Sequence, residues 1–381
     1  MDENDTKNPT SPLNSSILDK IIGSQTQSDL NQFQPESLVT SLLAALKERD
    51  REVLSKRFGL DGMEIETLEG IGKKYTLTRE RVRQIEKDSL NLLKKQKNVE
   101  LEKALQLIFD TIKEHGHIIS EELLMSTMQV GKSDTKERQS VKFLLNLGSQ
   151  FRGLRETPEY YEAWYIVGFD LSRLQQVISE FMTILEVSGK VLSQDDLNNQ
   201  FKQTQFFKEH EAELSDRVMK SYLNIAKIIQ INPYSEIGLK NWNEVKPRDV
   251  GDKAYLVLKH HGKPEHYSQI TKLINDNKFD NRVAYQETVH NELIKDARFV
   301  LIGRGIYALS EWGYKKGVVA DVIKEILKSF NRPLSRDEII NEVLKKRQVK
   351  RNTILVGLSN RNFFQKVGKD KYSLVEPKPQ V

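Results

Sequence analysis

The 381-residue sequence predicts a mainly α-helical fold, in which a helix-turn-helix segment is followed by tandem winged-helix-like modules with small β-hairpins. Three observations support this prediction. Apolar residues recur at helical spacing through residues 37–97. A pattern of helices and a hairpin then repeats about every 70 residues, and each repeat closes in an aromatic-rich, alternating stretch. A single α+β domain is the alternative, and the regular period argues against it.

The composition is that of a polar globular protein, with 38% hydrophobic and 30% charged residues, as several small cores require. The sequence has no cysteine, which excludes disulfides and thiolate metal sites and fits a reducing cytoplasm. No apolar run approaches the roughly 18 residues that span a bilayer. The N-terminus is acidic and lacks the layout of a signal peptide. We therefore expect a cytoplasmic protein without a membrane partner.

The first 36 residues carry six acidic and two basic side chains among many polar ones, and they are predicted to be a disordered tail. A helix is predicted from Pro35 through Leu46, and another ends near Phe58. Their apolar residues at helical spacing are interpreted as core beneath the helix-turn-helix: Leu42, Leu43, Leu46, Val53, Leu54 and Phe58.

Residues 67–95 predict two helices joined by a tight turn. The first helix has an inner stripe of Leu68, Ile71 and Tyr75. The second helix opens at the N-cap residue Thr78. Its predicted buried face consists of Val82, Ile85, Ser89 and Leu92.

The other face of this second helix is polar and basic, with Arg79, Glu80, Arg83, Gln84 and Lys87 near its N-terminus. A helix-turn-helix places such a helix in the major groove with its N-terminal residues toward the bases. Arginine can grip guanine at two points, glutamine suits adenine, and glutamate can accept from cytosine. Residues 70–97 hold nine basic and three acidic side chains. The alternative interpretation is a solvated charged helix face.

The strings RFGL, TLEGIG and TRERVRQIE, between Arg57 and Glu86, closely resemble region 4 of sigma-70-type bacterial sigma factors. The resemblance implies that Arg79, Glu80, Arg83 and Gln84 read a −35-like promoter element. It also implies that Thr78, Arg81, Lys87 and Lys73 lie near phosphates.

The same resemblance implies double-stranded promoter DNA and the β flap of core RNA polymerase as partners, in a bacterial, nucleoid-associated setting. The flap would dock on part of the apolar surface formed by residues 37–60. Two departures from the family pattern are Gly70, where a helix former is usual, and Thr76, where glycine or asparagine is more common. No counterpart of sigma region 2 is found, so we expect a protein that does not open promoters alone.

Four turns mark the repeat, at Gly116, Gly189, Gly262 and Asn331. Each is followed by a capped helix, and Ser335 with Glu338 predicts a capping box. Ser193 with Asp196 predicts an acidic variant of that box. The predicted modules cover residues 100–168, 171–244, 249–314 and 317–376.

Residues 250–314 closely resemble the HARE helix-turn-helix module, which occurs in the δ subunit of bacterial RNA polymerase. That resemblance implies a nucleic-acid or polymerase contact. Arg304, between Gly303 and Gly305, is predicted at the tip of the wing hairpin, aimed at a phosphate or groove. In the fourth module Lys350 and Arg351 open the predicted recognition helix and are expected to contact phosphates. Solvated charge is the alternative for this surface. The first two modules lack such a basic helix, and protein contact or spacing is expected for them.

No motif for catalysis, a cofactor or a small-molecule substrate is found, and three histidines near residue 262 lack ligands at metal spacing. The leading hypothesis is a DNA-binding regulator of transcription initiation that acts through RNA polymerase. The alternatives are a sequence-specific regulator that never contacts polymerase and a sequence-nonspecific nucleoid-architectural protein.

Overall fold

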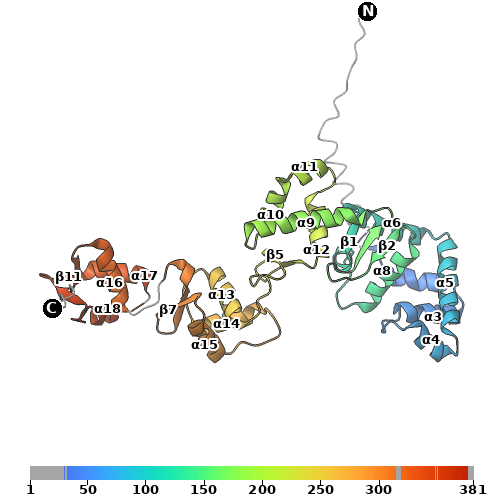
Figure 1. Cartoon of the computed structure of the whole chain (residues 1–381). Coiled ribbons are helices and arrows are strands. Elements are labelled where there is room, and N and C mark those ends of the chain that lie inside the picture. The colour runs from blue at the N-terminus through green and yellow to red at the C-terminus, as the bar shows by residue number, and fades with distance from the viewer. Residues whose placement is uncertain (1–29, 31, 315–318, 348, 350, 376–381) are drawn as a thin grey trace, which may run out of the picture. The chain divides into compact units, whose positions relative to one another are not determined.

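The structure is a computed structural model, and it describes residues 30, 32–314, 319–347, 349 and 351–375. It is mainly helical with small antiparallel sheets, as the sequence predicts (Figure 1). The chain divides into two compact units, Met1–Gln230 and Ile231–Val381. Most of the predicted N-terminal tail lies outside the described residues.

The first unit opens with the helices of the helix-turn-helix segment, which are α2 (Pro35–Leu43), α3 (Glu48–Phe58), α4 (Leu68–Tyr75) and α5 (Arg79–Lys95). The first of these ends three residues earlier than predicted, because Ala45 and Leu46 donate their backbone N–H groups three residues back, in tighter turns. Gly59 ends α3 in the left-handed conformation, with φ of 68°.

A second group of elements completes the core of this unit: α6 (Val99–Glu114), β1 (Ile118–Ser120), α7 (Glu121–Thr127), α8 (Thr135–Leu147), β2 (Phe151–Leu154) and β3 (Ala163–Ile166). Its three strands form an antiparallel sheet in the order β1-β3-β2. The next elements are α9 (Leu171–Ser188), α10 (Gln194–Lys202), α11 (Gln205–His210), α12 (Asp216–Ile225), β4 (Ile229–Ile231) and β5 (Ile237–Leu239).

In the second unit the same order of elements occurs twice. The first occurrence is α13 (Val250–His261), β6 (Glu265–His266), α14 (Tyr267–Asn277), α15 (Gln286–Lys295), β7 (Phe299–Gly303) and β8 (Ile306–Leu309), followed by the short 3₁₀ helix η1 (Ser310–Trp312). The second is α16 (Val319–Phe330), β9 (Leu334–Ser335), α17 (Arg336–Lys346), α18 (Arg351–Leu358), β10 (Phe364–Lys366) and β11 (Lys371–Leu374). The sheets have the orders β6-β8-β7 and β10-β11-β9.

The four predicted turns all adopt positive φ: 84° at Gly116, 59° at Gly189, 73° at Gly262 and 45° at Asn331. This is the conformation that favours glycine and asparagine at the end of a helix. The regularly spaced glycine and asparagine residues therefore reflect a repeated need for positive φ at these turns.

The predicted capping box at Ser335 is confirmed. The Ser335 side chain accepts from the Glu338 backbone, and the Glu338 side chain accepts from the Ser335 backbone at 2.7 Å. The acidic variant at Ser193 differs: the Asp196 carboxylate accepts from the Ser193 hydroxyl itself, at 2.8 Å.

Helix α12 packs against β1 within the first unit. The Ser221 hydroxyl donates to the Ile118 carbonyl, and the Tyr222 hydroxyl donates to the Gly116 carbonyl, both at 2.9 Å. Because Tyr222 is buried, its phenol pKa is raised far above the ordinary value. The two successive groups of elements in residues 99–230 are thus joined through hydrogen-bonded, buried side chains.

Candidate nucleic-acid interface

The turn between α4 and α5 holds two helices at close range. A Cβ placed on Gly72 would lie 2.6 Å from the Leu77 carbonyl oxygen, so a larger residue there would force the backbone apart. Thr76 ends α4 in the left-handed conformation, with φ of 59°. This geometry explains why glycine or asparagine is usual there: a β-branched residue at positive φ is strained.

Helix α5 begins as predicted at the N-cap Thr78, whose hydroxyl accepts from the Arg81 backbone N–H at 3.1 Å. Its inner face packs Val82 and Ile85 against Val53 of α3 and Ile71 of α4. The prediction that Leu92 faces inward is wrong. Leu92 is 48% exposed, whereas the adjacent Leu93 is fully buried.

Two polar contacts tie α3 to the helix-turn-helix. The Arg57 side chain is 3.2 Å from the Glu86 carboxylate of α5, and the Tyr75 hydroxyl donates to Glu52 at 2.7 Å. Burial, with the bond to Glu52, raises the pKa of Tyr75 to about 12, so the phenol stays protonated at neutral pH. These contacts hold α4 and α5 in one orientation relative to α3.

The outward face of α5 is exposed and carries the four predicted base-reading residues, which we call the reading face: Arg79, Glu80, Arg83 and Gln84. Arg83 is bonded to Glu80 through two hydrogen bonds of 2.6 and 2.8 Å. That bond lowers the pKa of the Glu80 carboxyl. Two of the four residues of the reading face are therefore bonded to each other when no DNA is bound.

The predicted phosphate-contacting residues surround the reading face. Thr78, Arg81 and Lys87 are exposed on α5, and the exposed Lys73 of α4 pairs with Glu69 at 2.9 Å. Arg81 donates to Gln84 at 3.2 Å. Among the residues that the structure describes, Lys87 makes no hydrogen bond or ion pair, so its charge is available to an anion. The N-terminus of α5 adds a partial positive charge to the same surface.

A positively charged helix such as α5, packed on a second helix across a tight turn, has the geometry of a helix-turn-helix. Residues 42–95 match the family model described as Sigma-70, region 4. The match begins in α2 and ends at the last residue of α5, so it contains the turn and the whole reading face.

The RNA polymerase sigma factor RpoS of Coxiella burnetii (strain RSA 493 / Nine Mile phase I) is 45% identical to the chain over 78 residues. That alignment covers 18% of this chain and 22% of the relative. The chain therefore spans about a fifth of the sigma factor that it matches.

The apolar residues of α2 and α3 are core residues, as one interpretation of the sequence proposed. Leu42, Leu43, Leu46 and Leu54 are buried in one hydrophobic core together with α6 and α8. The resemblance implies that part of this surface receives the β flap of polymerase, which stays a prediction. In the structure, residues of α6 and α8 share the core with these side chains. Leu46 is only 9% exposed, so charge at this position would disturb the core.

The remaining predicted site residues lie in the second unit. Arg304 is exposed at the tip of the hairpin between β7 and β8, as predicted, and Gly305 beside it has φ of 69°. Arg351 opens α18 and pairs with Asp337. Lys350 lies outside the described residues. The roles of all three remain predictions.

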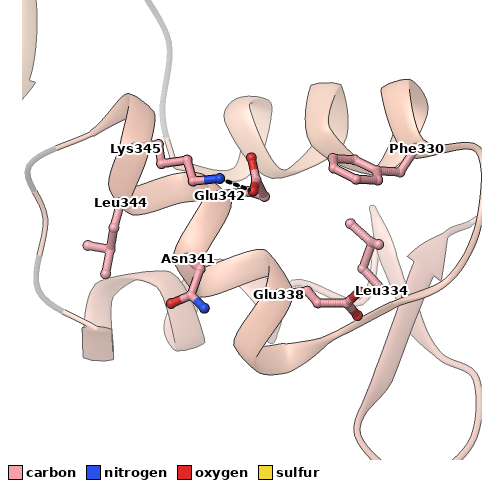
Figure 2. A pocket seen from close by; sticks show the side chains of 7 residues that line it. All are labelled: Phe330, Leu334, Glu338, Asn341, Glu342, Leu344 and Lys345. Carbon is pink, nitrogen blue, oxygen red and sulfur yellow. Dashed lines mark hydrogen bonds and ion pairs between the residues drawn. The ribbon is translucent and has the colours of Figure 1, made fainter.

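A shallow pocket in the second unit does not add a ligand site. Figure 2 shows its lining from the end of α16 and along α17, with Lys345 turned onto Glu342 at 2.6 Å. Glu338 in the same lining is engaged by the Ser335 backbone. Glu338, Glu342 and Lys345 of this lining are thus already bonded within the chain.

Within the described residues, no group of three or more histidine, cysteine, aspartate or glutamate side chains could hold a metal ion. None of the helices that the structure describes is long and apolar enough to cross a membrane. One feature of the site, the Glu80–Arg83 pair, was not predicted from the sequence. Its i, i+3 spacing on a helix was the signal that could have revealed it.

Proposed function

We propose that this chain binds promoter DNA at a −35-like element through the reading face of α5 and regulates transcription initiation through RNA polymerase, in the cytoplasm of a bacterium. The observation that carries the proposal is the exposure of Arg79, Glu80, Arg83 and Gln84 on the first turns of a helix packed as a helix-turn-helix. Matches to a sigma region 4 family and to a sigma factor support it.

Each part of this surface has a distinct task in the proposal. Arg79 and Arg83 present donors for guanine, Gln84 presents an amide for adenine, and Glu80 presents an acceptor for cytosine. Thr78, Arg81, Lys87 and Lys73 hold phosphates on either side and set the register. Sequence preference then comes from the reading face and affinity from the phosphate contacts.

The experiment is selection of bound duplexes from a randomised pool by the full chain, followed by retention of the protein on core RNA polymerase. The proposal predicts one recurrent motif related to a −35 element and co-sedimentation with the core enzyme. Selection without any recurrent motif would contradict base reading. A motif without co-sedimentation would instead support a regulator that acts without polymerase.

A second candidate function, nonspecific architectural DNA binding, is supported by the charge of the C-terminal segment. Residues 319–375 contain thirteen basic and six acidic side chains. Lys346, Lys369 and Lys371 are exposed and have no hydrogen-bond or ion-pair partner for their side chains among the described residues. In this second proposal they contact phosphates together with Arg304, Lys350 and Arg351, without distinguishing bases.

The module at residues 250–314, which resembles the HARE domain, contributes to either function as a contact to polymerase or flanking DNA. Arg304 at its hairpin tip is the residue that we propose for this contact. Arg304→Ala is expected to weaken binding to cognate and scrambled duplexes by the same factor. A loss confined to one sequence would contradict a phosphate role.

A further inference from the structure

The apolar side of the region-4-like segment is covered by a helix of the same chain. Leu42 and Leu54 are 1% and 0% exposed, and both belong to the core that also contains Val141, Phe143 and Leu144 of α8. Helix α8 begins about 40 residues after the end of α5. In Figure 1 it lies beside the helices of the segment within the first unit. The cover is therefore a distant segment and not a local turn.

Specific contacts fix α8 on this side. The rings of Phe58 and Phe143 meet edge to face with centroids 5.1 Å apart. Lys136, at the start of α8, lies 3.2 Å from the Glu36 carboxylate of α2. A Cβ placed on Gly62, in the turn after α3, would lie 3.0 Å from Cγ of Lys136. Contacts thus run from α2 through the end of α3 to the turn that follows it.

The helix-turn-helix has little core apart from this cover. Its separate cluster consists of four buried residues, Val53, Ile71, Val82 and Ile85, with three partly buried neighbours. The other buried apolar side chains of the segment, including the fully buried Leu93 at the end of α5, belong to the core shared with α6 and α8. Without α8 this core would lose part of its apolar cover.

We propose that α8 is the permanent occupant of the apolar face of α2 and α3, so that this face does not receive an external helix. A contact with RNA polymerase, which rests on the function proposed above, then uses another surface of the chain. The closure of the face by α8 does not depend on that function. The reading helix α5 accordingly depends on residues 99–166 for its position.

The absence of cysteine from the sequence allows a direct test by thiol labelling of the full chain. Leu42→Cys places a thiol on the covered face of α2, and Ala45→Cys places a matched thiol at an exposed position just beyond the same helix. We expect the thiol at position 42 to react at least about tenfold more slowly, with and without core RNA polymerase. Hydrogen exchange of α2 amides in the unmodified chain, expected to be slow, provides the same information without substitution.

Three results decide the proposal. Slow labelling in both conditions supports it. Fast labelling of the free chain, with fast exchange of α2 amides, would overturn the closure. Slow labelling that accelerates when polymerase is added would show that a partner displaces α8. It would overturn the proposal that α8 occupies this face permanently. Failure of the proposed function is seen separately, as absence of co-sedimentation with polymerase, and leaves the labelling of the free chain unchanged.

Two variants of α8 test whether this helix is what protects the thiol at position 42. Phe143→Ala removes the ring that meets Phe58, and we expect it to accelerate labelling at position 42 by about tenfold or more. Asn146→Ala, at an exposed position of the same helix, is expected to leave the rate unchanged. Equal rates in the two variants would contradict the assignment of α8 as the cover.

Discussion

Replacing Arg83 by alanine tests whether α5 reads bases. In the free protein the Arg83 guanidinium is held by two hydrogen bonds to Glu80, and the two side chains are 55% and 58% exposed. Reading guanine requires Arg83 to leave this pair. Because the pair is exposed and screened by salt, opening it removes only a small part of the gain from the base contact.

The expected size of the effect follows from these two contributions. A two-point contact between arginine and guanine discriminates against a wrong base by roughly fivefold to 150-fold. Opening the exposed ion pair with Glu80 offsets part of this gain. We therefore expect Arg83→Ala to weaken affinity for the cognate duplex by about 5- to 30-fold, in the lower part of that range. The scrambled duplex is expected to change by less than about twofold.

The assay is fluorescence anisotropy with cognate and scrambled duplexes over a series of salt concentrations. Lys87→Ala is the matched control, since Lys87 is exposed on the same helix and has no hydrogen-bond or ion-pair partner within the described residues. It should weaken both duplexes equally and reduce the salt slope by about one. If Arg83→Ala also weakened both duplexes equally, base reading at this position would be refuted.

Three further predictions concern stability. Gly72→Ala should lower the free energy of unfolding, measured in denaturant melts, by about 1–3 kcal/mol, because the new methyl group would meet the Leu77 carbonyl. Gly70→Ala in the same helix is the control and should be neutral or stabilising. Equal losses in the two variants would refute the packing argument. Thr76→Gly should raise the melting temperature by relieving a positive φ, a gain of about 1 kcal/mol, and a lower melting temperature would contradict strain at this turn. The backbone N–H of Ser335, with Arg332, lowers the pKa of Glu338 to about 2, so its contribution to stability is complete above its ordinary pKa and is lost as the pH falls toward 2. Calorimetry of Glu338→Gln, which keeps the cap geometry, should show a flatter dependence on pH over this window, and unchanged dependence would argue against the role of the carboxylate.

Local structure was predicted well from the sequence because its causes are local. The N-cap of α5 at Thr78 follows from a hydroxyl that bonds three residues ahead. The repeated turns follow from residues that tolerate positive φ, such as Gly189 and Asn331. Thr76 was singled out differently, as a departure from the sigma family pattern, and it has a positive φ of 59°.

What the sequence did not reveal depends on distant segments. Leu92 and Leu93 are both compatible with a helical stripe, and only the core shared with α8 decides that Leu93 is the buried one. The cover over Leu42 and Leu54 was missed for the same reason, since periodicity indicates an apolar face but not what packs against it. The resemblance to sigma factors suggested an external partner for a face that the structure closes from within.

The most direct test of the central claim is the affinity of the full chain for a duplex that contains a −35 element, compared with a scrambled duplex, at two salt concentrations. We predict a preference of tenfold or more, about 1.4 kcal/mol, that persists at the higher salt concentration. Equal affinities that fall together as salt is raised would contradict base reading by α5 and favour architectural binding through the basic residues.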